Sequence, residues 1–145
     1  MSTGNFTNYL RDVLLDEVFG GQDYTPPVSL YVGLSTTTPT DEGTNFTEPD
    51  SADAYARVEV DNDLTTWVAS DDGFKENDID FEFPEATGSW GEVTHFAIFD
   101  GAEGTGENML AWGELAIAKT IDEGDIATFR SGDVEITLSA CVENS

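Results

Sequence analysis

Residues 79–99 read IDFEFPEATGSWGEVTHFAIF and contain two different strand patterns separated by a turn. In residues 79–83, large apolar side chains alternate with carboxylates, which predicts a strand with one buried and one solvent-exposed face. Residues 93–99 are apolar on both faces apart from Thr94 and His95, so we expect a central strand or one covered by a helix. This segment therefore predicts a layered β-structure.

Short β-rich runs separated by Gly, Pro, Asp and Asn continue on both sides of this segment. The predicted strands cover residues 28–34, 55–60, 64–68, 79–83, 92–99, 109–115, 126–130 and 134–142. About eight strands with frequent turns favour an all-β fold, a jelly-roll-like β-sandwich, over an α/β fold. Cys141 is the only cysteine, and we expect it to be a small apolar side chain in the last strand.

One amphipathic helix is predicted, from about Phe6 to Phe19, with Asn5 as its N-cap and Gly20-Gly21 at its end. Apolar residues recur there mostly at three- and four-residue steps: Phe6, Tyr9, Leu10, Val13, Leu14 and Val18. An isolated helix of this length is marginal in water. We therefore expect residues 1–21 to dock on the same domain or on a neighbouring subunit, and residues 22–145 to form the β-sandwich domain.

The charge balance is the strongest compositional signal. Thirty Asp and Glu residues face five Lys and Arg residues, which gives a formal net charge of −25, and the acidic residues are spread through all the turns. Such a surface repels itself at low salt, whereas the Debye length falls to about 3 Å at 1 M salt. An acidic protein of an ordinary cytoplasm more often concentrates its charge in a tail. The composition predicts a halophilic source and argues against direct binding of nucleic acid.

Two loops stand out. Residues 35–53 are rich in Thr, Pro, Asp and Glu and hold one large apolar residue, Phe46. A loop of this length is usually functional, so we expect it to contact another subunit or the host, the alternative being a disordered acidic insertion. Residues 101–108 hold three glycines and are expected to form a mobile hairpin tip.

The sequence shows no catalytic signature and no complete metal-binding motif. His95 is the single histidine and is interpreted as a hydrogen-bonded sheet residue, because no nucleophile and orienting acid can be assigned to it. Residues 61–63 begin like a calcium loop, but Thr66 and Asp72 stand where that loop requires Gly and Glu. The chain is predicted to be non-enzymatic and without a cofactor or dedicated metal site, with weak cation binding by surface carboxylates left open.

The candidate interaction surface combines apolar residues of the predicted helix, the large apolar residue of the acidic loop and a turn tryptophan, which is a candidate for contact with sugar. Its residues are Phe6, Tyr9, Leu10, Val13, Leu14, Phe46 and Trp90. No stretch approaches the ~20 apolar residues of a membrane span, and the N-terminus lacks the pattern of a secretion signal, so no membrane insertion is expected.

Several segments, in order along most of the chain, resemble a family of small structural proteins of tailed phages that are often labelled tail fibre or minor virion protein. They are residues 19–27, 30–34, 39–41, 55–57, 83–91, 93–100 and 110–113. The resemblance implies an oligomeric virion component with no catalytic residues. Its implied partners are further copies of itself, other virion proteins and a host surface layer or glycan.

Together with the charge, the resemblance predicts a virion protein of a haloarchaeal tailed virus, assembled in the host cytoplasm. Two placements stay open: a tail fibre or baseplate component, and a capsid turret or decoration protein. In either one, the protein would contribute to particle architecture and host attachment. The alternative from a different class is a halophilic carbohydrate-binding module or enzyme accessory domain.

Overall fold

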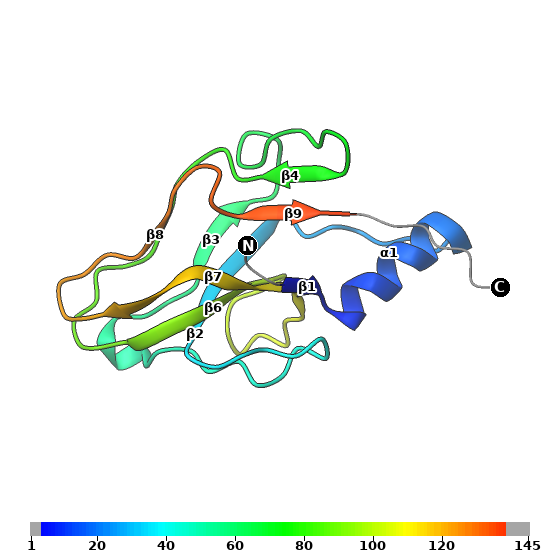
Figure 1. Cartoon of the computed structure of the whole chain (residues 1–145). Coiled ribbons are helices and arrows are strands. Elements are labelled where there is room, and N and C mark those ends of the chain that lie inside the picture. The colour runs from blue at the N-terminus through cyan, green and yellow to red at the C-terminus, as the bar shows by residue number, and fades with distance from the viewer. Residues whose placement is uncertain (1–3, 139–145) are drawn as a thin grey trace.

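The computed structural model describes residues 4–138 and consists mainly of antiparallel strands with one α-helix (Figure 1). The elements in chain order are β1 (Gly4–Phe6), α1 (Asn8–Gly20), β2 (Ser29–Ser35), the 3-10 turn η1 (Ser51–Asp53), β3 (Val58–Asp61), β4 (Phe74–Glu76), β5 (Phe81–Glu82), β6 (Gly91–Phe99), β7 (Met109–Ile121), β8 (Thr128–Phe129) and β9 (Glu135–Thr137). The predicted all-β fold with one N-terminal helix is confirmed.

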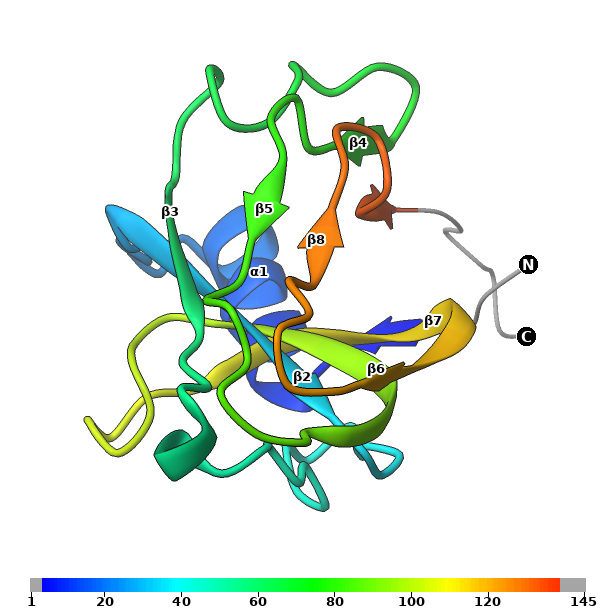
Figure 2. The ribbon, with the colours of Figure 1, turned by 90° about the vertical axis from the view of Figure 1, so that its left-hand side faces the viewer.

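Five strands form one antiparallel sheet in the order β1-β7-β6-β2-β3. The middle strand is β6, so the prediction that residues 93–99 lie in the centre of a sheet is confirmed. Two short ladders, β5–β8 and β4–β9, form the second layer over one face of this sheet (Figure 2). They are shorter than the strands predicted for residues 126–130 and 134–142, and Cys141 lies outside the described residues.

Both faces of the five-stranded sheet are covered. On one face, Val32 packs in the main core with Phe81 and Phe83 from the second layer. On the other face, Phe99 packs in a smaller cluster, and Phe46 from the loop between β2 and β3 lies against it. This explains why β6 is apolar on both faces, but the element that covers its second face is a loop and not the helix.

The strand predicted for residues 64–68 is wrong, because Asp63 turns the chain there. Its side-chain oxygen Oδ1 accepts the backbone N–H groups of Thr65 and Thr66, each at 3.0 Å, and its carbonyl accepts the N–H of Trp67 at 3.1 Å. Side-chain hydrogen bonds of this kind compete with a strand ladder. The segment forms a turn that delivers Trp67 to the core.

The helix starts later than predicted. Asn5 pairs with Trp112 in the β1–β7 ladder, and Phe6 also lies in β1, so neither residue belongs to the helix. Thr7 is the N-cap, since its side chain accepts the N–H of Leu10. The predicted end at the glycine pair is confirmed: Gly21 has φ 65°, a left-handed conformation that costs glycine little.

Candidate functional site

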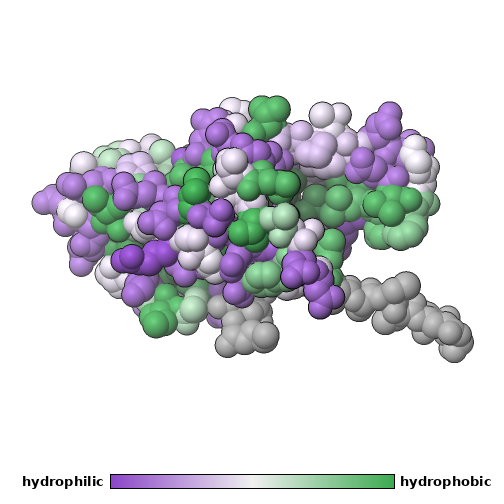
Figure 3. All heavy atoms as spheres, turned by 90° about the horizontal axis from the view of Figure 1, so that it is seen from above, coloured by the Kyte–Doolittle hydropathy of each residue, from purple (hydrophilic) through white to green (hydrophobic). Residues whose placement is uncertain are grey.

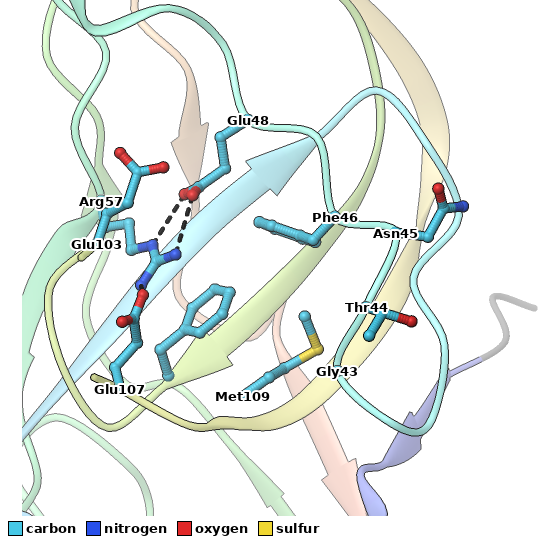
Figure 4. Close-up of a pocket in the computed structure, with 10 residues that line it drawn as sticks. Gly43, Thr44, Asn45, Phe46, Glu48, Arg57, Glu103, Glu107 and Met109 are labelled. Atoms are coloured by element: carbon cyan, nitrogen blue, oxygen red, sulfur yellow. Dashed lines mark hydrogen bonds and ion pairs between the residues drawn. The ribbon is translucent and has the colours of Figure 1, made fainter. Parts of the chain in front are cut away.

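An open pocket lies on the sheet face opposite the second layer, between the β2–β3 loop and the β6–β7 hairpin (Figure 4). Its volume is about 410 Å³. Its walls come from the loop, from the hairpin and from the sheet beneath them: Gly43, Thr44, Asn45, Phe46, Glu48, Arg57, Phe99, Glu103, Glu107 and Met109. The two loops singled out in the sequence therefore meet at one site.

Arg57, just before β3, forms the floor of this pocket. Its Nε and Nη2 atoms each donate to a carboxylate oxygen of Glu48 at 2.9 Å. Its Nη1 donates to Glu107 at 2.7 Å and to the carbonyl of Gly101 at 3.1 Å, and the guanidinium lies 3.5 Å from the ring centroid of Phe99. All three nitrogens are engaged, so Arg57 ties the loop to the hairpin and is not presented to an incoming anion.

The cluster continues beneath Glu48. The Tyr55 hydroxyl donates to Glu48 Oε1 at 2.6 Å and accepts the backbone N–H of Leu34 at 3.0 Å. Gly33 in β2 makes this approach feasible, because a Cβ atom there would lie 2.8 Å from Glu48 Oε1 and 3.0 Å from the Tyr55 hydroxyl oxygen. The loop is thereby seated directly on the sheet.

Burial and hydrogen bonding set the protonation of the cluster. Burial alone would raise the pKa of Glu48, but the hydrogen bonds from Arg57 and Tyr55 outweigh it and hold that pKa below its ordinary value. Glu107 behaves in the same way, since the hydrogen bond from Arg57 lowers its pKa against the effect of burial. The contact with Glu48 raises the pKa of Glu103 at the rim. Three carboxylates thus gather near one guanidinium, which donates hydrogen bonds to Glu48 and Glu107.

The acidic loop is ordered by its own hydroxyl groups. The N–H of Thr36 donates to the carbonyl of Thr47 at 3.0 Å, and the Ser35 hydroxyl oxygen accepts the N–H of Thr47 at 2.9 Å. Further along, the Thr40 and Thr44 hydroxyls lie 2.7 Å apart. The Thr-rich composition therefore forms a hydrogen-bonded loop, and the alternative of a disordered insertion does not describe it.

The same loop holds the base of α1. The Asp41 carboxylate accepts hydrogen bonds from Trp112 Nε1 at 3.1 Å and from Arg11 at 3.3 Å, and its carbonyl accepts the N–H of Asn8 at 2.8 Å. The Thr7 hydroxyl is buried and donates to the carbonyl of Met109 at 2.7 Å. Burial would raise the pKa of Asp41, but the hydrogen bonds from Trp112 and Arg11 hold it below its ordinary value. The first turn of the helix is therefore fixed to the sheet and to the loop.

The predicted interaction residues fall into different environments. On α1, Leu10, Val13 and Leu14 are half-buried and Tyr9 is exposed, while Phe46 lies in the pocket. Trp90, in contrast, is buried in the main core, where its Nε1 donates to the carbonyl of Asp53 at 2.9 Å. A surface role for Trp90 does not fit this burial.

His95 lies buried in β6 and its Nδ1 is 2.8 Å from the Thr94 hydroxyl oxygen. Burial lowers its pKa, while the charge of Glu114 acts in the opposite direction. This geometry fits a hydrogen-bonded histidine within a sheet. Elsewhere in residues 4–138, no group of three or more His, Cys, Asp or Glu side chains is arranged to hold a metal ion.

Arg57 and Glu48 were not singled out by the sequence. With thirty acidic residues, no particular partner could be assigned to any of the five cations. One signal was available: Arg57 lies inside the strand predicted for residues 55–60, and an arginine that becomes buried there needs a charged partner. The part of the chain that the structure describes contains no helix that is long and apolar enough to cross a bilayer.

The described residues form an antiparallel β-domain in which Arg57 joins the β2–β3 loop to the β6–β7 hairpin. A family model described as Podophage GP4 fiber I protein gp80 matches residues 5–137. The chain therefore belongs to this phage fibre family, which associates it with the virion and with other virion proteins. No curated protein matches the chain.

Proposed function

We propose that this chain is a non-enzymatic structural component of a tailed virus of haloarchaea, where it forms an oligomeric surface appendage. Its role would be in particle architecture and host attachment, as a tail fibre or baseplate component or as a capsid turret. The observation that carries the proposal is the fibre-family match over residues 5–137. No dedicated cofactor belongs to the proposal, only weak cation binding by surface carboxylates.

The salt-loving host is supported by the charge. A net charge of −25 on 145 residues opposes compaction in dilute buffer and is screened in concentrated salt. We expect the purified chain to lose most of its β-structure by circular dichroism when potassium chloride is dialysed away, and to regain it when salt is restored. A chain that is equally stable in both solutions would remove the haloarchaeal part of the proposal and leave the fibre part untouched.

The central experiment locates the protein on the particle. Intact virions would be labelled with an antibody against the chain and imaged by electron microscopy. Label at the tail supports a fibre or baseplate component, and label on the capsid supports a turret. Virions with no label, and no copy of the chain by mass spectrometry, would refute the virion role.

The proposed oligomer is supported by β7. In the β6–β7 ladder, Val93 pairs with Lys119 and His95 with Glu114, so residues 115–118 of β7 lie opposite Thr94 alone. Such a bulge pushes a strand outward. Ile117 in this bulge is 69% exposed. If copies associate through it, Ile117→Asp should yield monomers in analytical ultracentrifugation, whereas Leu64→Asp, at a position of similar exposure, should not.

A second candidate function is that of a carbohydrate-binding module. The pocket favours it, because apolar Phe46 and Met109 stand beside carboxylates that can accept hydrogen bonds from sugar hydroxyls. Glycans released from the host surface layer would be titrated by calorimetry against the chain and against Phe46→Ala. Saturable binding that the variant loses would favour this candidate, and an absence of heat at high glycan concentration would eliminate it.

A further inference from the structure

The free end of α1 exposes a group of apolar side chains. Leu15 is 56% exposed, Val18 68% and Phe19 83%. We call these three residues the α1 tip. The helix projects from one end of the domain (Figure 1), and hydrophobic atoms gather at that end of the molecule among polar surroundings (Figure 3).

The limited burial of the helix favours a partner for this surface. α1 has 13 residues and none of its side chains is buried. Isolated helices shorter than ~12–15 residues are marginal in water, and most helices in proteins are stabilised by packing. Within residues 4–138, the first turns of the helix are held by the hydrogen bonds of Thr7 and Asp41 and by the packing of Leu10 against the main core. The α1 tip is therefore presented on a fixed base, with its apolar surface available.

The charges around the tip indicate the chemistry of the partner. Asp12, Asp16 and Glu17 are exposed on the same helix, and no basic residue lies in its last turn. The negative end of the helix dipole therefore adds to these carboxylates. A surface that meets the tip needs an apolar groove with a rim of Lys or Arg.

A second copy of this chain offers only Lys75, Lys119 and Arg130 for such a rim. The whole chain has five Lys and Arg residues, and two of them are already in ion pairs, Arg11 with Asp41 and Arg57 with Glu48 and Glu107. Two tips facing each other would bring like charges together. The partner is therefore a different protein.

We propose that the α1 tip anchors the chain to the particle by inserting into an apolar, basic-rimmed groove on another virion protein. This inference rests on the proposed virion role and adds to it the surface and the kind of partner. It separates anchoring, by α1, from self-association, by β7.

The experiment uses particles of the virus that encodes the chain, prepared from a strain in which its gene is deleted. Purified wild-type chain and variants are added, and the copies bound per particle are counted by quantitative mass spectrometry. Val18→Asp should bind about tenfold more weakly or worse, because it places a charge in the apolar contact. The matched control is Leu64→Asp, a position that is 65% exposed in the turn after β3, and it should bind like wild type.

Charge reversal identifies the partner's chemistry. Asp12→Lys with Asp16→Lys should weaken binding in the concentrated salt in which the chain folds, because charges in direct contact with the rim are screened less than distant ones. The matched control, Glu85→Lys with Glu123→Lys, makes the same change in net charge at exposed positions outside α1. If the reversed pair instead strengthened binding and self-association, the occupant would be a second copy and the inference would be wrong.

Three further outcomes also decide the matter. If removing residues 139–145 raised the exposure of the tip to a hydrophobic dye and strengthened binding, the chain's own C-terminus would be the occupant, which overturns the inference. If wild-type chain binds the particles and Val18→Asp binds equally well, the inference fails while the virion role stands. If wild-type chain does not bind at all, the virion role fails and this inference with it.

Discussion

The Arg57 cluster and the α1 tip differ in how far their side chains find partners within the chain. In the cluster, one cation is buried among carboxylates and all of its nitrogens are engaged within the chain. At the tip, the large apolar side chains of Leu15, Val18 and Phe19 stay 56–83% exposed in the part of the chain that the structure describes. The contrast indicates which interactions the isolated chain completes by itself and which depend on assembly: stability resides in the cluster, and association in the tip.

The largest effect on stability should come from Arg57→Met. This change leaves Glu48 buried without its cation, and breaking one partner of a buried ion pair costs about 3–5 kcal/mol. Chemical unfolding in concentrated potassium chloride would measure the loss. The control, Arg130→Met, removes an exposed arginine and should change the free energy of unfolding by less than about 0.5 kcal/mol. Equal losses in both variants would contradict the role given to the cluster.

Acid should loosen the same cluster. The pKa of Glu48 is lowered in the folded state, so its stabilising effect is fully present above its ordinary value of 4.5 and is lost as the pH falls through the folded-state pKa. Glu107 acts in the same direction. The free energy of unfolding should fall as the pH drops below about 4.5, and less steeply in Glu48→Gln. An identical pH profile in that variant would exclude Glu48 as a source of the dependence.

The sequence predicted those parts of the fold that depend on one strand or one helix. The apolar side chains on both faces of β6 predict a strand in the middle of a sheet. The two glycines that follow the helix predict its end. The strand predicted for residues 64–68 is wrong because the Asp63 side chain accepts hydrogen bonds from the N–H groups of Thr65 and Thr66. The alternation of apolar and polar residues does not reveal this competing interaction. The predicted start of the helix is wrong because residues 4–6 form a strand. A strand of three residues is too short to show a pattern in the sequence.

The candidate site was predictable only as a region. The composition of the loop pointed to Phe46, and the hairpin was recognised from its glycines, but their meeting at Arg57 depends on the long-range pairing of strands. Trp90 lies in a turn by sequence and in the core by structure, because its side chain reaches across to Asp53. A turn residue with a large side chain can still be a core residue.

The base of α1 lies between the Arg57 cluster and the α1 tip. Thr7→Val tests whether the hydrogen bonds at this base stabilise the helix without affecting the β-domain. This nearly isosteric change removes the N-cap and the hydrogen bond to Met109, at a cost of about 1–2 kcal/mol. Helix content by circular dichroism should fall, while the unfolding of the β-domain stays cooperative. Thr120→Val, at an exposed position in β7, is the control and should leave helix content unchanged.

The smallest effect, and the one with the opposite sign, should come from Glu103→Gln. Contact with Glu48 raises the pKa of Glu103, so ionised Glu103 opposes folding at neutral pH; this opposition declines as the pH falls below the folded-state pKa and is lost below the ordinary value of 4.5. The neutral amide should therefore stabilise the protein slightly at pH 7 and not at pH 4. Glu85→Gln removes the same single negative charge from an exposed position and therefore controls for the general effect of net charge. A gain that is the same for both variants would mean that only the general repulsion is relieved, whereas a larger gain at Glu103 would show that its contact with Glu48 opposes folding.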